Sequence, residues 1–403
     1  MTTVRTSVRS TQTSETAERS GSNTARLRRI GMFVHILDDR AVSRLNRRLC
    51  GRFAAAGVET VLICATRSRS AEMAVPDGVT VRNLALKDQP TMFAVARLAA
   101  LLRELQLDVL FAHGNGPSRT AILARMLGRV ATRIVAVEHT HYSTFYTQRM
   151  WVRDRLTPLL YARADRVAGV SSGVVADLEA RFPAIRGNTT VLPSLGPDPN
   201  DLPRLVRDTP DHPWFAHRDG VKLLCSVANL VPRKGQATLV EALPLIRREA
   251  GDVRLVLVGR FDDQAFVARL RQRCGELGIG EYVWFAGYQD NALPFIAHAD
   301  VFVLASETEG AGMVLTEAMA CGVPVVSTDC PTGPAFVLDG GRYGILVPVG
   351  DTRQFATAVV RVLTDTQLRE GLIAGGYERA SQFTADRVAQ QYLVVARQVL
   401  AER

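Results

Sequence analysis

Lysine and long apolar runs are the two clearest shortages in this sequence. Only three of its 49 basic residues are lysine, namely Lys87, Lys222 and Lys234. A run of about 18 apolar residues would indicate a membrane-spanning helix, and the chain contains none. Its first residues also lack the apolar core of a secretory signal. We therefore expect a cytoplasmic protein that has no transmembrane segment.

Paired cysteines and nucleic-acid motifs are missing too. None of the six cysteines has Cys-x-x-Cys spacing, and most lie in apolar segments. That pattern is typical of reduced core thiols rather than of disulfides or a zinc site. The net charge of +9 fits phosphate-bearing substrates and an anionic membrane surface. No basic stripe with interleaved aromatic residues accompanies this charge, so we expect no nucleic-acid partner.

The composition is that of a globular protein with one unusual end. The chain has 403 residues, 47% hydrophobic and 22% charged, which suits two or three domains. Residues 1–27 are rich in Ser, Thr and Arg and nearly free of large apolar side chains. A segment of that kind cannot bury enough apolar surface to fold. We predict that it is a disordered basic tail.

Short apolar runs alternate with helical patterns along the whole chain, which predicts a parallel α/β architecture. In the first half the predicted strands are Ile30–Ile36, Thr60–Ala65, Val79–Leu84, Val109–Ala112, Ile134–Val137, Val167–Val170 and Thr190–Leu192. Predicted helices between them include Ser43–Ala56, Met92–Leu105, Pro117–Leu127 and Gly173–Arg181. Residues 196–220 are rich in Pro and Asp and lack periodicity, so we expect an interdomain linker there.

The same pattern begins again after the linker. Predicted strands are Leu223–Val227, Arg254–Val258, Val283–Ala286, Val301–Leu304, Pro324–Ser327 and Ile345–Val347. Predicted helices include Gln236–Arg247, Gln264–Leu277, Ala292–His298 and Val314–Cys321. After Asp351 we expect helix to the end of the chain, with breaks near Gly375–Gly376 and Phe383. Two doubly wound domains, residues 28–195 and 221–384, would then bind ligands outside the carboxyl ends of their strands.

The most informative segment carries two glutamates eight positions apart, Glu309 and Glu317. Glu309 lies in a small-residue loop after a predicted buried strand, and Glu317 lies about one turn inside the following helix, which ends at Gly322. The backbone N–H groups from Gly310 to Val314 have no partner within such a helix and can bind an anion. One short segment therefore offers donors for a diphosphate between two carboxylates.

This segment resembles the nucleotide-sugar site of the retaining family-4 glycosyltransferases. Their pattern is E-G-x-G-x-x-x-x-E-A-M-A-C-G-x-P-V-V, and the chain reads Glu309-Gly310-Ala311-Gly312 and then Glu317-Ala318-Met319-Ala320-Cys321-Gly322-Val323-Pro324-Val325-Val326. The resemblance is close over residues 222–351 and looser over 28–195. It implies the GT-B fold, in which two Rossmann-like domains face a cleft. It also implies that the last helix, within residues 385–403, crosses back onto the N-terminal domain.

The resemblance assigns the phosphates to a basic turn, Arg233 and Lys234 before Gly235. The family pattern there is R-x-x-x-x-K-G, and the family arginine falls on Asn229 in this chain. Arg233 is the candidate to replace it, since guanidinium and ammonium groups both bind phosphate. Together with the N–H groups of Gly310, Ala311, Gly312 and Met313, Lys234 would hold the diphosphate. The alternative is an ordinary solvated basic turn.

The other donor contacts follow from the same resemblance. Glu317 would accept hydrogen bonds from the ribose hydroxyls, and Glu309 would contact the sugar beside the reacting carbon. Gly259 matches a second glycine loop, although a strand-to-helix turn needs glycine for geometry alone. Tyr288 falls where the nucleotide base usually lies. No Asp-x-Asp pair occurs in the chain, so we expect a metal-independent enzyme that has no cofactor.

Two histidines follow predicted strands of the first domain. His139 matches the family histidine that reaches the donor sugar, and His113 matches a second histidine of the cleft. A lone histidine is more often structural, but two at successive strand ends favour a site. A zinc site formed by His113, His139 and His141 is the less favoured alternative, because no fourth ligand is evident.

Two positions depart from the family pattern. Many members carry paired glycines after the first strand, whereas this chain has Asp38 and Asp39 in a loop without glycine. These carboxylates cannot donate hydrogen bonds to an anion, so we expect them to bind hydroxyl groups of the acceptor substrate. The second departure is Phe336, where the family often has glutamate.

The sequence thus predicts a retaining glycosyltransferase. It would transfer a sugar from a nucleotide diphosphate, with UDP-hexose or UDP-hexosamine favoured. The acceptor would be a lipid-linked glycan or a polysaccharide at the inner membrane face, where we expect peripheral contact with anionic lipid. Two alternatives stay open: a GT-B epimerase or phosphorylase, and a non-catalytic nucleotide-sugar-binding scaffold. Their products, or the lack of any turnover, would distinguish them.

Overall fold

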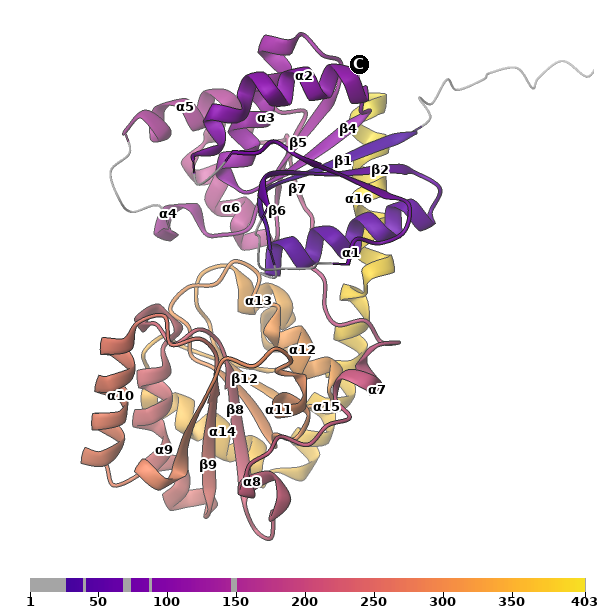
Figure 1. Ribbon diagram of the computed structural model, residues 1–403. Helices are drawn as coiled ribbons and strands as arrows, with labels where there is room; N and C mark the ends of the chain where they lie inside the picture. The colour runs from indigo at the N-terminus through magenta and orange to yellow at the C-terminus, as the bar shows by residue number, and fades with distance from the viewer. Residues whose placement is uncertain (1–26, 39–40, 68–73, 87–88, 146–150, 403) are drawn as a thin grey trace, which may run out of the picture.

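Two parallel sheets form the framework of the protein (Figure 1). The computed structural model describes residues 27–38, 41–67, 74–86, 89–145 and 151–402. Asp39 and the predicted tail up to residue 26 lie outside these residues. The first sheet has the strand order β3-β2-β1-β4-β5-β6-β7, and the second has the order β10-β9-β8-β11-β12-β13. This arrangement confirms the predicted α/β architecture of two doubly wound sheets.

Every predicted strand is present, and its ends differ from the prediction by at most two residues. The first sheet contains β1 Arg29–Leu37, β2 Glu59–Arg67, β3 Val79–Asn83, β4 Val109–His113, β5 Arg133–Glu138, β6 Arg166–Gly169 and β7 Thr189–Val191. The second sheet contains β8 Lys222–Val227, β9 Val253–Val258, β10 Val283–Gly287, β11 Val301–Leu304, β12 Val325–Thr328 and β13 Ile345–Val347. All recorded pairs are parallel.

Helices of very different length connect and cover the strands. Those before the linker are α1 Ala41–Ala55, α2 Val95–Leu105, α3 Asn115–Gly128, α4 Tyr142–Phe145, α5 Trp151–Tyr161 and α6 Ser172–Arg181. The linker contains two short helices, α7 Leu202–Leu205 and α8 Pro213–Ala216. The remainder are α9 Gln236–Ala250, α10 Gln264–Glu276, α11 Leu293–Ala297, α12 Val314–Ala320, α13 Gly333–Val337, α14 Thr352–Thr364, α15 Thr366–Ala380 and α16 Ala385–Ala401. No helix of the described residues is both long enough and apolar enough to span a membrane.

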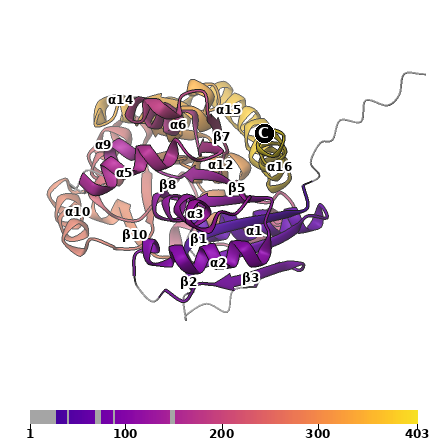
Figure 2. The ribbon, with the colours of Figure 1, turned by 90° about the horizontal axis from the view of Figure 1, so that it is seen from above.

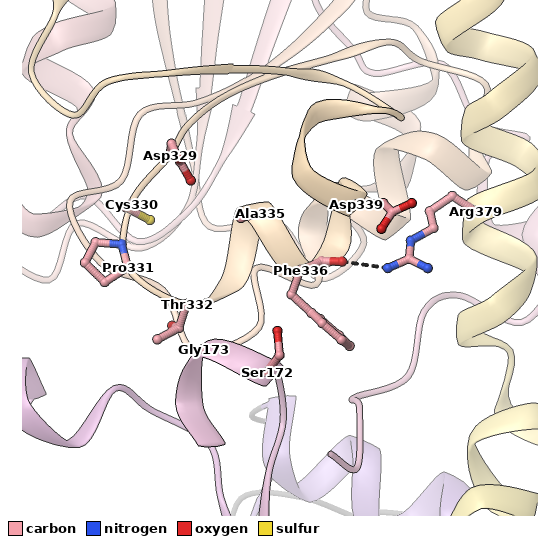
Figure 3. Close-up of a pocket in the computed structure, with 10 residues that line it drawn as sticks. All are labelled: Ser172, Gly173, Asp329, Cys330, Pro331, Thr332, Ala335, Phe336, Asp339 and Arg379. Carbon is pink, nitrogen blue, oxygen red and sulfur yellow. Dashed lines mark hydrogen bonds between the residues drawn. The ribbon is translucent and has the colours of Figure 1, made fainter. Parts of the chain in front are cut away.

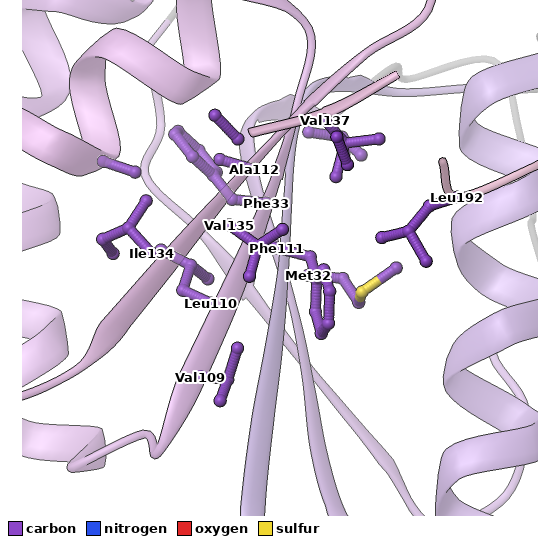
Figure 4. Packing of buried hydrophobic residues seen from close by; sticks show 14 of the residues in the cluster. Met32, Phe33, Val109, Leu110, Phe111, Ala112, Ile134, Val135, Val137 and Leu192 are labelled. Atoms are coloured by element: carbon purple, nitrogen blue, oxygen red, sulfur yellow. The ribbon is translucent and has the colours of Figure 1, made fainter. Parts of the chain in front are cut away.

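The central strands of the first sheet are buried on both faces, as the apolar runs require. All five residues of β4 are buried, and Phe33, Phe111 and Val135 pack together in the core shown in Figure 4. The last helix, α16, completes the same core. Its Tyr392 ring lies 5.0 Å from the ring of Phe111. Figures 1 and 2 both place α16 beside α1, so the C-terminal helix does cross back onto the N-terminal domain.

The predicted helix break at Gly375–Gly376 is wrong, because α15 runs through both glycines. The break lies instead at Asp365, whose side chain accepts a hydrogen bond from the N–H of Leu368 and caps α15. The glycines serve packing. An added Cβ at Gly375 would lie 3.1 Å from the Tyr343 ring. The break near Phe383 is confirmed by a short 3₁₀ turn, Ser381–Phe383.

Candidate functional site

A charged pair lies at the carboxyl edge of the second sheet. The Nζ of Lys234 is 2.5 Å from Oε1 of Glu309, and the Ser306 hydroxyl donates to the same oxygen at 2.7 Å. The two charged side chains are only 15% and 11% exposed. A pair this sheltered from water interacts more strongly than a surface ion pair. The structure therefore brings together Lys234 and Glu309, which are 75 positions apart in the chain.

Gly235 explains how the loop of Lys234 reaches this position. Its φ is +67°, and a Cβ added there would lie 1.8 Å from the carbonyl oxygen of Ala305. No side chain fits in that space, so only glycine lets the turn after β8 close onto the end of β11. The contact places Lys234 directly beside the loop that carries Glu309. The glycine of the Lys-Gly motif therefore has a packing role of its own.

The Glu309 loop also meets the opposite domain through its backbone. A Cβ added at Gly310 would lie 1.8 Å from the carbonyl oxygen of His139. The Ser171 hydroxyl donates to the carbonyl oxygen of Gly310 at 3.0 Å. In the described part of the chain, the N–H groups of Ala311, Gly312 and Met313 donate no backbone hydrogen bond. These three donors stay available beside the interdomain contact.

The two predicted histidines form a hydrogen-bonded pair, in which His113 is buried and His139 is partly buried. Nδ1 of His113 lies 2.9 Å from Nε2 of His139, so one ring donates and the other accepts. Burial lowers the pKa of His139 to about 4, and burial together with the neighbouring His139 ring lowers the pKa of His113 well below its ordinary value. Both imidazoles are therefore neutral at pH 7. The ring of His113 also stacks on Tyr392 of α16, with their centroids 6.2 Å apart.

His141 does not join this pair. Its Nδ1 lies 3.0 Å from the Thr144 hydroxyl, and its Nε2 lies 3.4 Å from a carboxylate oxygen of Asp177. Across the described residues, no group of three or more His, Cys, Asp or Glu side chains is arranged to hold a metal ion. The structure thus gives the three histidines two separate sets of partners.

Glu317 is partly buried on α12. Its pKa is raised by burial, and the nearby positive charges of Arg44 and Arg48 oppose that rise. Both arginines belong to α1 of the N-terminal domain, and Arg48 also donates to the Gly196 carbonyl at 2.8 Å. The second glutamate of the motif therefore lies where positive charges of the opposite domain act on it.

The remaining predicted donor residues lie on neighbouring loops. Asn229 donates to Asp262 at 2.7 Å, and the side chain of Arg233 is exposed. The guanidinium of Arg260 lies 4.3 Å from the ring of Tyr288, which is half exposed. Gly259 has a φ of +151°, and an added Cβ would lie 2.0 Å from the Ala228 carbonyl oxygen. Glycine is therefore required there for packing, whatever the loop binds.

The first-strand loop has its own local structure. The Ser43 hydroxyl donates to Oδ1 of Asp38 at 2.9 Å and lies 2.8 Å from the Ile36 carbonyl oxygen. These contacts tie the end of β1 to the first turn of α1. Asp39 lies outside the described residues. Nothing in these contacts brings Asp38 to the pair formed by Lys234 and Glu309.

Three residues of the site region were not predicted from the sequence. Glu138 is buried, and burial raises its pKa to about 7 although the Tyr161 hydroxyl donates to it. Thr332 has a φ of +88°, which is strained for a β-branched residue, and its hydroxyl donates to the Glu309 carbonyl. Ser171 caps α6 and bonds to Gly310. A charged residue at the end of an apolar strand was a usable signal for Glu138, whereas Thr332 and Ser171 carried none.

Comparison with known proteins places the chain in a family. Residues 42–194 match Glycosyltransferase Family 4, and residues 221–365 match Glycosyl transferases group 1. A GDP-mannose-dependent phosphatidylinositol monomannoside mannosyltransferase of Mycolicibacterium smegmatis is 31% identical over 69% of this chain and 72% of its own length. The chain belongs to the family-4 glycosyltransferases, which adopt the GT-B fold. The charged pair and the paired histidines thus lie in a glycosyltransferase of this family.

Other relatives match over different lengths. An N-acetylgalactosaminyltransferase of Campylobacter jejuni that acts on a diphospho-undecaprenol glycan is 28% identical over 77% of this chain and 82% of its own length. The lipopolysaccharide core glycosyltransferase LpsE of Rhizobium meliloti is 37% identical over 42% of this chain. That match spans only about half of LpsE, 48% of its length.

Solved structures support the fold. A glycosyltransferase of Rickettsia africae has a TM-score of 0.78 at 15% identity, and the match covers 93% of this chain and 98% of that one. HepE of Anabaena in complex with UDP has a TM-score of 0.72 at 21% identity and covers 91% and 99%. At these identities the likeness establishes the GT-B architecture of this glycosyltransferase.

Proposed function

We propose that this glycosyltransferase transfers a sugar from a nucleotide diphosphate to an acceptor hydroxyl with retention of anomeric configuration. The observation that carries the proposal is the pair of Lys234 and Glu309, whose side chains are 2.5 Å apart, together with the contact of the Glu309 loop with His139 of the opposite domain. A cation for the leaving phosphate and an acceptor for sugar hydroxyls would then stand side by side. Available N–H donors follow on the same loop.

The residues of the pair have complementary tasks in this proposal. The bond between the anomeric carbon and the phosphate oxygen breaks, the acceptor oxygen bonds to the same face of that carbon, and the acceptor proton passes to the leaving phosphate. Lys234 has three N–H donors, so it can bind Glu309 and a phosphate oxygen together. With the N–H groups of Ala311 and Gly312, it would stabilise the negative charge that develops. Glu309 would orient the sugar and favour the positive charge on its ring.

A neutral His139 suits contact with the donor sugar. Its pKa of about 4 means that it brings no second positive charge at pH 7. It can still donate or accept one hydrogen bond through the nitrogen that does not face His113.

Lys234 would supply the cation for the diphosphate, so we expect transfer without a divalent metal ion. Activity that is lost in EDTA and restored by Mg²⁺ would contradict that expectation.

UDP-hexose or UDP-hexosamine is the proposed donor. HepE of Anabaena was solved with UDP and with UDP-glucose, whereas the mycobacterial relative is named for GDP-mannose. In this chain Tyr288 and Arg260 would offer a ring face and a cation to the base, and Glu317 would accept from the ribose hydroxyls. The choice between nucleotides therefore rests on a direct measurement.

Calorimetric titration of UDP, GDP and ADP into wild type and Glu317→Ala tests the donor site. A charged hydrogen-bond pair to ribose contributes roughly 1.5–3 kcal/mol, so one nucleotide should bind wild type about 10–150-fold more tightly than the variant. Glu307→Ala, a change at an exposed glutamate ten positions earlier, is the control and should bind like wild type. If none of the three nucleotides binds wild type, the proposed donor site is refuted, whereas nucleotide binding without turnover would favour the scaffold alternative.

The products test the reaction. With the selected nucleotide sugar, NMR should show free nucleotide diphosphate and a glycoside with the same anomeric configuration as the donor. An inverted product would refute retention. An epimerised nucleotide sugar or a sugar phosphate would identify the epimerase or phosphorylase alternative.

The proposed acceptor is a lipid-linked glycan or polysaccharide at the inner membrane face. The Campylobacter relative is named for such an acceptor, and the net charge of this chain is +9. Phe93, Leu127 and Leu159 of the N-terminal domain are 68%, 70% and 58% exposed. Sedimentation with vesicles should show binding to phosphatidylglycerol that weakens in about 0.5 M salt, because the Debye length there falls to roughly 4 Å and the attraction between charges is screened. Equal binding to phosphatidylcholine vesicles would contradict the charge-based contact.

A further inference from the structure

A pocket lies between the domains, beside the loop of Glu309. Its volume is about 500 Å³. The start of α6 forms one wall through Ser172 and Gly173, and the β12–α13 loop and α13 form the other (Figure 3). Thr332 lines this pocket and also donates to the Glu309 carbonyl. The pocket thus adjoins the candidate donor site without including Lys234 or Glu309.

The charges in this pocket do not suit a phosphate. Its one lining cation, Arg379, already donates to the Phe336 carbonyl at 2.6 Å, to the Val337 carbonyl at 2.8 Å and to Gln382 at 2.5 Å. Asp329 and Asp339 also line the pocket and are exposed. A carboxylate only accepts hydrogen bonds and repels another anion. The pocket therefore favours a ligand with several hydroxyl groups.

Phe336 supplies an apolar wall at the centre of the pocket. The family resemblance leads us to expect glutamate at this position, and this chain has an aromatic ring there. The ring is partly buried and packs edge-on against Phe383, with the centroids 6.1 Å apart. That packing holds the ring of Phe336 in its orientation. A fixed ring face beside hydroxyl acceptors matches the two kinds of surface on a sugar, its C–H face and its hydroxyl rim.

We propose that this pocket is a second carbohydrate subsite, which holds an uncharged sugar unit of the acceptor glycan. The sugar would lie against Phe336 and donate hydroxyl hydrogen bonds to Asp329 and Asp339. The assignment of this sugar to the acceptor rests on the function proposed above. The prediction that the pocket binds an uncharged sugar is independent of that function. A donor nucleotide would occupy the neighbouring site at the same time.

The subsite also couples sugar binding to the contact between domains. An added Cβ at Gly173 would lie 2.5 Å from Cα of Thr332, so the two walls meet at Gly173. A ligand that touches Ser172 on one wall and Phe336 on the other binds only when these walls are together. A bound sugar would therefore favour the closed arrangement of the domains.

Saturation-transfer NMR with simple glycosides tests the subsite. The probes are the methyl α-glycosides of glucose, galactose, N-acetylglucosamine and N-acetylgalactosamine, each measured with and without saturating UDP. At least one should bind wild type, and UDP should not displace it. Phe336→Ala and Asp329→Asn should each weaken that glycoside about five-fold. Phe93→Ala, which removes an exposed ring of the other domain outside the pocket, should leave it unchanged.

The two sites are distinguished by exchanging ligands and variants. Glu317→Ala should weaken the nucleotide and spare the glycoside, whereas Asp329→Asn should do the reverse. Nucleotide binding without any glycoside binding would overturn the subsite and leave the proposed function standing. Glycoside binding that both pocket variants leave intact, or displacement of the glycoside by UDP, would also overturn it. Because Asp329 is exposed, Asp329→Asn stays informative even if Phe336→Ala fails to fold.

Discussion

The two sides of the cleft differ in how they use charge. On the C-terminal side, Lys234 and Glu309 form a sheltered ion pair. On the N-terminal side, burial disfavours charge on His113, His139 and Glu138: it lowers the pKa of both histidines, that of His139 to about 4, and raises that of Glu138 to about 7. On both sides the groups lie at the ends of parallel strands. The C-terminal loops pair the charges of Lys234 and Glu309, whereas the N-terminal side keeps its two histidines uncharged. The N-terminal side is therefore suited to shaping and hydrogen bonding, and the C-terminal side to stabilising charge.

The largest expected effect is on the charged side. Glu309→Gln keeps the size of the side chain and removes its charge, so transfer should fall about 1,000-fold. Nucleotide affinity should stay nearly unchanged, because Lys234 and the backbone donors remain. Glu307→Gln, a change at an exposed neighbour, is the matched control for loop charge. Normal turnover of Glu309→Gln in a steady-state assay would remove Glu309 from the site.

The contact between the two sides gives the next largest effect. Gly310→Ala would place a Cβ 1.8 Å from the His139 carbonyl, so the loop must move away from the opposite domain. A displacement of about 1 Å can cost about 100-fold in rate, and we expect a loss of that size in transfer. Nucleotide binding by the C-terminal domain should persist.

Gly371→Ala is the control for this change, since an added Cβ at Gly371 in α15 has no heavy atom within 4 Å. Both variants add one methyl group, so they separate closure from a general effect of alanine. Small-angle scattering should show a larger radius of gyration for Gly310→Ala alone. Equal transfer by the two variants would mean that this contact is not needed for activity.

On the neutral side the expected loss is smaller. His139→Ala removes one neutral hydrogen bond to the donor, so transfer should fall about 10-fold while nucleotide affinity changes less. Equal losses of transfer and nucleotide binding would indicate a folding role instead.

Tyr392→Phe is the control for changes around the histidine pair. It keeps the ring stacked on His113 and removes a buried hydroxyl that has no hydrogen-bond partner within the described residues. It should retain full transfer.

On each side, the sequence predicted the features that depend on neighbouring residues and missed those that depend on packing between distant segments. The strands, the Lys234 turn and the Glu309 loop are contiguous motifs, and their apolar runs and glycines are visible in the sequence. The approach of Gly310 to His139 depends on how two domains pack across 171 positions, which no local pattern encodes. The wrong prediction of a helix break at Gly375–Gly376 has a similar origin, because glycine at 375 makes room for the distant Tyr343 ring rather than ending the helix. Whether the predicted site residues act in catalysis stays a prediction.

The smallest expected effect concerns pH and the buried carboxyl of Glu138. Its folded pKa of about 7 lies above its ordinary value, so between about pH 4.5 and 7 this carboxyl is protonated more in the folded protein than in the unfolded chain. This group therefore favours the folded state below about pH 4.5, and that contribution is lost as the pH rises through 7. The lowered pKa of His139 acts in the opposite direction, since it makes the folded state more stable as the pH rises from about 4.

Glu138→Gln keeps an acceptor for the Tyr161 hydroxyl and removes only the contribution of the Glu138 carboxyl. Urea unfolding at pH 5 and pH 8 should then show that the variant gains on the order of 1 kcal/mol relative to wild type at the higher pH, and an identical pH dependence for both proteins would show that Glu138 does not titrate in this range.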